Sequence, residues 1–524
     1  MLAQAGVRGD DLQSELDVRF NVVQLDTKGG TRCPVQCARN SPPGDAVMIQ
    51  WQQPLCSARR SHSAGCVCRV MVAAWLAATV QWNDAPAAEP CRIQIVDAES
   101  KWPVPLVELR TVNEVRFVSD NAGVIAFDLP EAMGRETWFF VKGHGYTVPA
   151  DGFNYRGVRL IPAPGKTLTV EVQRTIIAKR IGRITGSGLY GESQKSEPRH
   201  NAWESGVLGA DSVQNAVHNG RMYWFWGDTN LAHYPLGIFH ASGATSAVEP
   251  LESFTPPLRL RLDYFRDAHG KPRAVANMPG TGPTWLTGVI SLPDRQGQGH
   301  LLSAYMKVKP PLEAYEWGLA EWDDGRAAFV PLRTVWTKSE SAPKPPPLPE
   351  GHPVLWTDEH GAEWALFGNP FPTLKCPARY EAWQDPTTWT PLVPPEVLTD
   401  AEGNKVKPHS GSIAWNPFRQ RWVTVFMQQF GKPSAFGELW YAEARSPFGP
   451  WGTAVKVLSH DNYTFYNPRL HPEFTAQAPR VLLFEGTYTA TFAHHAEPTP
   501  RYDYNQVLYR LDLDDPALSA AHVP

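Results

Sequence analysis

Short runs of alternating apolar and polar residues, separated by turn residues, occur along most of the chain from about residue 90 onward. Residues 92–96 and 168–172 alternate in this way, which is typical of half-buried β-strands. Residues 222–226 (Met-Tyr-Trp-Phe-Trp) are apolar throughout and predict a buried central strand. No helical periodicity of comparable length dominates. The pattern therefore predicts an all-β protein.

A hairpin is predicted over residues 207–229, and its two aspartates are unusual. Residues 218–221 (His-Asn-Gly-Arg) supply the turn, where we expect His218 to be exposed. Asp211 lies before the first strand and Asp228 ends the second, although Asp is a poor strand former and is costly to bury unpaired. Either Asp228 ends its strand by bonding local backbone, or both carboxylates lie at one mouth of a barrel-like or propeller fold.

Strand patterns recur in the second part of the chain, residues 176–524. Five β-dense segments follow one another at a spacing of about 50 to 70 residues: 207–241, 284–322, 353–368, 410–444 and 467–511. Each segment offers three or four strands, as a propeller blade does. A five-bladed β-propeller is therefore predicted, and the alternative is a pair of β-sandwiches.

Residues 89–175 predict a small β-sandwich ahead of the propeller, because regular strands alternate there with turns. The stretch 119–127 (Ser-Asp-Asn-Ala-Gly-Val-Ile-Ala-Phe) resembles the hairpin of carboxypeptidase-regulatory-like sandwiches. That resemblance implies a module that presents or stabilises a neighbouring domain. The predicted fold class is all-β, with a small β-sandwich followed by a five-bladed β-propeller.

The first 88 residues predict export. Residues 1–60 share no pattern with the rest, and we interpret them as an upstream segment outside the mature protein. Residues 61–88 fit a signal peptide, since an apolar run at 70–80 follows basic residues and precedes an Ala-x-Ala site ending at Ala87. The 11-residue run is too short to span a bilayer, which takes about 20 residues; a buried helix is the alternative. We expect a secreted or periplasmic protein without membrane association after signal removal.

Composition and charge narrow the range of partners. Charged residues make up 19% of the chain, and the formal net charge of −4 gives no indication of a nucleic-acid or anionic-membrane partner. Cys91 and Cys376 remain after signal removal, and either two free thiols or one disulfide fits. No Cys/His spacing of a zinc site occurs in the mature part, and no cofactor is expected.

Three stretches carry a resemblance to a known group of enzymes. Residues 206–211 (Gly-Val-Leu-Gly-Ala-Asp) and 223–229 (Tyr-Trp-Phe-Trp-Gly-Asp-Thr) resemble the opening blade of five-bladed glycoside hydrolases. Residues 438–451 end in Ser-Pro-Phe-Gly-Pro-Trp, as blades of such propellers do. The most similar group is the arabinan-degrading one once classed as a domain of unknown function; glycoside hydrolase family 43 and the anhydrogalactosidases are more distant. The resemblance spans about residues 180–514 and implies a polysaccharide or oligosaccharide substrate.

Glycoside hydrolysis needs two carboxyl groups that flank the scissile bond. The resemblance makes Asp211 the first candidate for base or nucleophile and Asp228 a second carboxylate or an orienting group. Candidates for the acid are Glu485, Glu316 and Glu192. Glu485 is favoured because it closes an apolar strand, where burial would raise its pKa; its alternative role is a structural pair with an arginine.

Further residues are predicted to bind substrate. Arg469 offers a planar fork for the carboxylate or sulfate of an acidic sugar, or else forms a structural ion pair. His409 precedes a predicted inner strand, Glu316 lies beside an aromatic pair, and Trp285 could stack on a sugar ring. No Asp-rich calcium loop is visible, so no metal is assigned, and a channel ion stays open.

The sequence predicts a secreted glycoside hydrolase-like protein that cleaves a polysaccharide by carboxylate acid/base chemistry. No nucleophile elbow, phosphate-binding loop or dinucleotide fingerprint suggests another reaction. The alternative is a non-catalytic carbohydrate-binding or cell-surface propeller.

Overall fold

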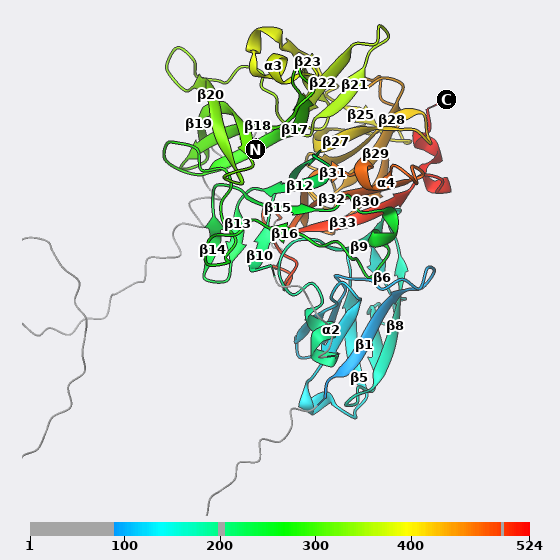
Figure 1. Ribbon diagram of the computed structural model, residues 1–524. Coiled ribbons are helices and arrows are strands. Elements are labelled where there is room, and N and C mark those ends of the chain that lie inside the picture. The colour runs from blue at the N-terminus through cyan, green and yellow to red at the C-terminus, as the bar shows by residue number, and fades with distance from the viewer. Residues whose placement is uncertain (1–88, 198–204, 494–496, 524) are drawn as a thin grey trace, which may run out of the picture. The chain divides into compact units, whose positions relative to one another are not determined.

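The computed structural model describes residues 89–197, 205–493 and 497–523, so the predicted upstream segment and signal peptide lie outside the described residues. The described chain is all-β, as predicted, with only short helices such as α2 Gly191–Ser196, α3 Tyr380–Gln384 and α4 Pro472–Thr475 (Figure 1). Within these ranges, no helix is both long and apolar enough to cross a membrane.

The first eight strands form two four-stranded sheets, ordered β4-β1-β8-β6 and β3-β2-β5-β7. Their bounds are β1 Cys91–Asp97, β2 Glu108–Thr111, β3 Arg116–Val118, β4 Val124–Phe127, β5 Thr137–Lys142, β6 Tyr146–Thr147, β7 Gly157–Leu160 and β8 Thr167–Arg174. Buried and half-buried residues alternate along β1, as its sequence predicts, and residues of both sheets share one apolar core. The predicted turn before β4 is present: Asp120 accepts from the backbone N–H of Gly123, whose φ is +68°.

Five antiparallel four-stranded sheets make up most of the remaining chain (Figure 1). The first contains β11 Gln214–His218, β12 Arg221–Trp226, β15 Ser242–Ser246 and β16 Asp263–Tyr264. The second contains β17 Thr284–Pro293, β18 Gly299–Lys309, β19 Glu313–Asp323 and β20 Ala328–Thr337. The third contains β21 Val354–Thr357, β22 Glu363–Gly368, β23 Pro372–Pro377 and β24 Thr390–Pro391, and the fourth contains β27 Pro408–Asn416, β28 Arg421–Gln428, β29 Leu439–Ala444 and β30 Val455–Leu458.

The fifth sheet combines strands from distant parts of the chain. It contains β31 Thr464–Leu470, β32 Val481–Thr489 and β33 Asn505–Asp512, and its fourth strand is β9 Lys179–Arg183. Smaller sheets are formed by β10 Val207–Ala210, β13 Thr229–Leu231 and β14 Tyr234–Ile238, and by β25 Leu398–Thr399 with β26 Lys405–Val406. The sequence pattern did not predict β9, because a Lys-Arg-Ile-Gly-Arg run has no apolar alternation.

Side-chain hydrogen bonds link each of the five sheets to the next. The links are His218 Nδ1 with Ser291 Oγ (2.9 Å), the Gly351 N–H to Thr287 Oγ1 (2.8 Å), the Gly411 N–H to Asn369 Oδ1 (2.7 Å), the Asn467 N–H to Ser410 Oγ (3.2 Å), and Asn467 Nδ2 to Ser212 Oγ (2.8 Å). The last of these connects the fifth sheet back to the first. Residues in or beside each sheet are therefore hydrogen-bonded to residues in or beside the next.

The burial of His218 and of the two cysteines can be compared with what the sequence predicted. His218 is buried and hydrogen-bonded to Ser291, so the expectation that it is exposed was wrong; the turn itself is as predicted, with Asn219 and Gly220 at positive φ. Cys91 and Cys376 are both free and buried, which answers the open question of a disulfide.

Candidate active site

Asp211 and Asp228 lie together at the open end of the β11–β12 hairpin. The Asp211 carbonyl accepts from the Gly227 N–H at 2.8 Å, and the Asp211 N–H donates to the Asp228 carbonyl at 3.3 Å. The Asp211 carboxylate also lies directly over Gly227: a Cβ there would be 2.4 Å from Asp211 Oδ1. Only glycine leaves room for this approach, so the local backbone fixes the position of the carboxylate.

Asp211 accepts hydrogen bonds from several hydroxyl groups. The Tyr466 hydroxyl donates to Oδ2 at 2.7 Å, and Tyr504 and Ser212 also bond to this carboxylate. Burial raises the pKa of Asp211, and these hydrogen bonds act in the opposite direction because they stabilise the ionised form. Asp211 is therefore the carboxyl group of the pair that is better suited to carry the negative charge.

Asp228 has a different environment. Among the described residues, its side chain is hydrogen-bonded to the Trp285 indole, whose Nε1 donates to Oδ1 at 3.2 Å. Burial and, to a smaller extent, the charge of Asp211 together raise the pKa of Asp228 to about 7. The carboxyl group of Asp228 is therefore the member of the pair that is better suited to hold a proton near neutral pH.

Three residues around Asp211 have left-handed backbone conformations: Ser212 (φ 54°), Asn467 (φ 52°) and Tyr504 (φ 59°). Such conformations cost about 1–3 kcal/mol for residues other than glycine and gather at functional sites. Here Asn467 Nδ2 donates to Ser212 Oγ, and the Ser212 N–H donates to Thr487 Oγ1 at 2.9 Å. The hydrogen bonds offset the strain and hold the residues on both sides of Asp211 in place.

Glu485, the favoured candidate for the acid, lies in a separate buried network. It is 0% exposed, and its Oε1 lies 2.8 Å from Nε2 of His471. Burial disfavours the charged form of both groups. It raises the pKa of Glu485 well above its ordinary value and lowers the pKa of His471 well below its ordinary value. Among the described residues, no hydrogen bond joins Glu485 to Asp211, so the structure does not bring these two predicted catalytic residues into contact.

Arg469 belongs to the same buried network. It is 5% exposed and pairs across the β31–β32 ladder with Glu485. Its Nε donates to Asn215 Oδ1 at 3.0 Å, and its Nη2 lies 3.3 Å from Glu473. The guanidinium is thus used within the fold, which matches the alternative role of a structural ion pair.

The other candidates occupy different places. Glu316 accepts from the Tyr305 hydroxyl at 2.9 Å, within the β18–β19 ladder. His409 is half-buried, and burial lowers its pKa to about 4, so the ring is neutral at physiological pH. Glu192 is buried in α2 and forms ion pairs with Lys195 and Arg501. Of the predicted substrate-binding residues, Trp285 alone contacts the acid pair among the described residues.

Two tyrosines of the site were not predicted from the sequence. Tyr466 and Tyr504 are two of 16 tyrosines, and no local pattern distinguishes them. The one available signal was position: Tyr466 lies directly before the Asn-Pro pair of a predicted strand. Metal binding finds no support in the described chain, where no group of three His, Cys, Asp or Glu side chains could hold an ion.

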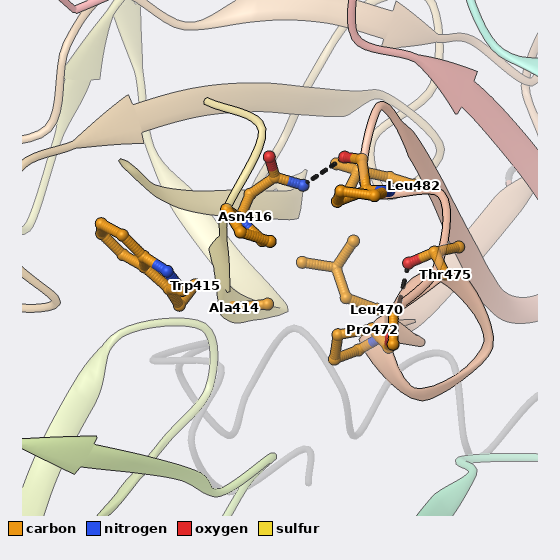
Figure 2. A pocket seen from close by; sticks show the side chains of 10 residues that line it. Ala414, Trp415, Asn416, Leu470, Pro472, Thr475 and Leu482 are labelled. Atoms are coloured by element: carbon orange, nitrogen blue, oxygen red, sulfur yellow. Dashed lines mark hydrogen bonds between the residues drawn. The ribbon is translucent and has the colours of Figure 1, made fainter. Parts of the chain in front are cut away.

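A small pocket lies away from the acid pair, at the C-terminal end of β27 (Figure 2). Its volume is about 30 Å³, and Asn416 Nδ2 donates there to the Pro479 carbonyl. Its lining contains no titratable side chain. This pocket therefore offers neither the space nor the groups for acid/base chemistry.

No protein-family model matches the chain, and no curated protein matches it. Among solved structures, the exo-β-1,3-galactanase of Phanerochaete chrysosporium crystallised with galactose is 10% identical, with a TM-score of 0.35 over 63% of this chain; the match spans 64% of the galactanase. An exo-1,5-α-L-arabinanase from a bovine ruminal metagenomic library is 13% identical, with a TM-score of 0.33 over 59% of this chain and 95% of the arabinanase. A GH43_1 enzyme from Xanthomonas citri complexed with xylotriose is 12% identical, with a TM-score of 0.34 over 58% of this chain and 87% of that enzyme. Similarities this distant leave the reaction and the substrate to be argued from the residues of this chain.

Proposed function

We infer that the chain is a glycoside hydrolase that cleaves glycosidic bonds in a polysaccharide, with Asp211 as base or nucleophile and Asp228 as acid. The observation that carries this proposal is the unequal environment of two adjacent carboxyl groups. Asp211 receives hydroxyl donors, whereas burial and a neighbouring charge raise the pKa of Asp228 to about 7. Paired carboxyl groups with separated proton affinities are the equipment of glycoside hydrolysis.

The residues define a proton path for the reaction. Asp228 gives its proton to the glycosidic oxygen as the bond to the anomeric carbon breaks. Asp211 then either removes a proton from the attacking water, which inverts the anomeric carbon, or attacks that carbon itself, which retains its configuration after hydrolysis of the glycosyl intermediate. In the second case the incoming water returns a proton to Asp228. Trp285, which bonds Asp228, would contact the sugar ring.

The architecture that we propose for this function is a five-bladed β-propeller over residues 176–524, preceded by a β-sandwich over residues 89–175. The support is the succession of five four-stranded sheets, the hydrogen bonds that tie the fifth sheet to the first, and the pairing of β9 with β33. Asp211 and Trp285 both lie where the first strand of a sheet begins, so the site would occupy one mouth of the propeller.

We also propose that the mature chain is exported, because the polysaccharide substrate would be extracellular. Its support is the predicted signal peptide at residues 61–88. N-terminal sequencing of the exported protein tests it, and the expected first residue is Ala88 or Glu89.

Hydrolysis is tested with the purified protein on arabinan, galactan and sulfated polysaccharides, by release of reducing ends. Asp211→Asn is expected to abolish release while the protein stays folded, and Asp267→Asn, in an exposed turn, is the matched control. A polysaccharide that is cleaved equally by wild type and Asp211→Asn would rule out the assigned role. Binding without cleavage would indicate the non-catalytic carbohydrate-binding protein instead.

A further inference from the structure

A cavity of about 520 Å³ opens beside the first residue of β27, apart from the acid pair. Its walls come from the β22–β23 connection with Asn369, from the segment after β24 with Val397, and from Pro408 at the start of β27. Cavities of about 300–1,000 Å³ are typical of small-molecule sites. The cavity is therefore large enough for sugar units, unlike the small pocket at the other end of β27.

The cavity and the acid pair are connected through β27 and β31. Pro408 lines the cavity, and Ser410, two strand residues or roughly 7 Å further along, accepts from the Asn467 N–H at 3.2 Å. Asn467 follows Tyr466, whose hydroxyl binds Asp211. The cavity and the acid pair are thus separated by residues of β27 and β31. An oligosaccharide of a few units can cover the distance between them.

An aromatic surface lies along this path. The His409 ring packs on Phe436 with ring centroids 5.3 Å apart, and Phe436 packs on Phe430 at the same distance. Phe430 is 61% exposed, and its neighbour Gln429 donates a backbone hydrogen bond to the Lys407 carbonyl beside the cavity. An exposed aromatic ring beside the cavity offers a face to the C–H groups of a sugar.

The cavity lining carries charges of both signs. Lys407 and Glu396 line it, and neither forms an ion pair with a described residue. Phe371 and Val397 add apolar surface. Sugar hydroxyls can accept from the ammonium group and donate to the carboxylate, whereas an anionic sugar would meet Glu396 as well as Lys407. The chemistry of the lining therefore suits an uncharged sugar.

We propose that this cavity is a distal subsite, which binds an uncharged sugar unit of the same polysaccharide whose glycosidic bond lies at Asp211 and Asp228. The proposal rests on the proposed function and refines it, because it specifies a neutral glycan that is longer than the unit cleaved. Activity should therefore depend on chain length beyond the scissile bond.

The first test compares two valines. Val397→Trp places an indole in the cavity from a side chain that is 42% exposed, and Val393→Trp, at a residue 96% exposed and outside the lining, is the control. Val397→Trp is expected to raise KM for the neutral polysaccharide about tenfold. It should leave KM for the shortest cleaved oligosaccharide unchanged. Equal shifts on both substrates, or none on either, would overturn the subsite. Lys407→Ala, with the exposed Lys405→Ala as control, provides a second variant pair.

The second test measures binding without hydrolysis. Wild type, Asp211→Asn, Val397→Trp and Val393→Trp are run on native gels containing neutral arabinan, neutral galactan or polygalacturonate. A neutral polymer is expected to retard every protein except Val397→Trp. Absence of retardation in both neutral gels, equal retardation of Val397→Trp, or retardation by polygalacturonate alone would each contradict the subsite. Undiminished hydrolysis by Asp211→Asn would instead refute the catalytic assignment and leave the gel result to decide the subsite.

Discussion

At the scale of single residues, the position of the Asp211 carboxylate depends on the absence of a side chain at Gly227. Gly227→Ala would place a methyl carbon 2.4 Å from Asp211 Oδ1, so the carboxylate must move. We expect kcat to fall about a hundredfold, since displacements near 1 Å have effects of this size. Steady-state kinetics measure the loss, and circular dichroism checks the fold.

The matched control for this substitution is Gly152→Ala, because a Cβ at Gly152 meets no atom within 4 Å. It should leave kcat unchanged. If Gly227→Ala retained full activity, the carboxylate of Asp211 would not need the position that the structure gives it.

The residues of the site differ in how well the sequence could predict them. Asp211 and Asp228 were predictable because a carboxylate at the end of an apolar strand conflicts with strand propensity and with burial. Tyr466 was not, because it reaches Asp211 across 255 residues of sequence. The burial of Glu485 followed from its apolar strand, but its partner His471 depended on the local path of the chain after β31.

At the scale of secondary-structure elements, the β31–β32 ladder buries Glu485, and we propose that this carboxyl group has a structural role. Burial raises the pKa of Glu485 and lowers that of His471, which favours the neutral form of each group. Because Asn215 Nδ2 donates to His471 Nδ1, the neutral imidazole carries its proton on Nε2 and donates it to Glu485 Oε1. Glu485→Gln keeps an acceptor oxygen at this position. We expect hydrolysis to persist and the free energy of unfolding to change by less than about 1 kcal/mol.

Kinetics and urea denaturation of Glu485→Gln measure these two quantities. If Glu485 were the catalytic acid, as the sequence suggested, the same variant would lose about a hundredfold or more in kcat, because an amide cannot supply the proton. Such a loss with an unchanged free energy of unfolding would return the role of acid to Glu485.

At the scale of the whole molecule, β9 joins the two ends of the described second part of the chain. Ile181 in β9 is fully buried in a core cluster that also contains residues of β12 and β33, such as Trp224 and Leu508. Ile181→Ala is expected to lower the global free energy of unfolding by about 2–5 kcal/mol, the usual range for such a deletion in a core. Urea denaturation measures it.

Ile161→Ala, at a residue that is 57% exposed, is the control and should change the free energy of unfolding little. A similarly small effect for Ile181→Ala would mean that β9 is a local attachment and does not contribute to global stability.

The sheets were largely predictable from the sequence, but their assembly was not. Alternation and apolar runs located strands in each of the five segments, because one buried face leaves a period of two in the sequence. The pairing of β9 with β33 joins residues more than 300 positions apart, and no local pattern encodes it. Arg180 and Arg183 leave β9 without apolar alternation, although both are buried; Arg180, for example, donates to the carbonyls of Pro105 and His144.

The central claim is that Asp228 supplies the proton and Asp211 carries the charge. The most direct measurement is kcat/KM against pH for wild type and for Trp285→Phe, because this quantity reports the pKa values of the free enzyme. Since the acid must be protonated and its pKa is about 7, the wild-type rate should fall as pH rises through about 7. The Trp285 hydrogen bond lowers that pKa, so its removal should move the alkaline limb to higher pH. A wild-type rate with no alkaline limb near this pH, or a limb that Trp285→Phe leaves in place or moves to lower pH, would contradict the assignment.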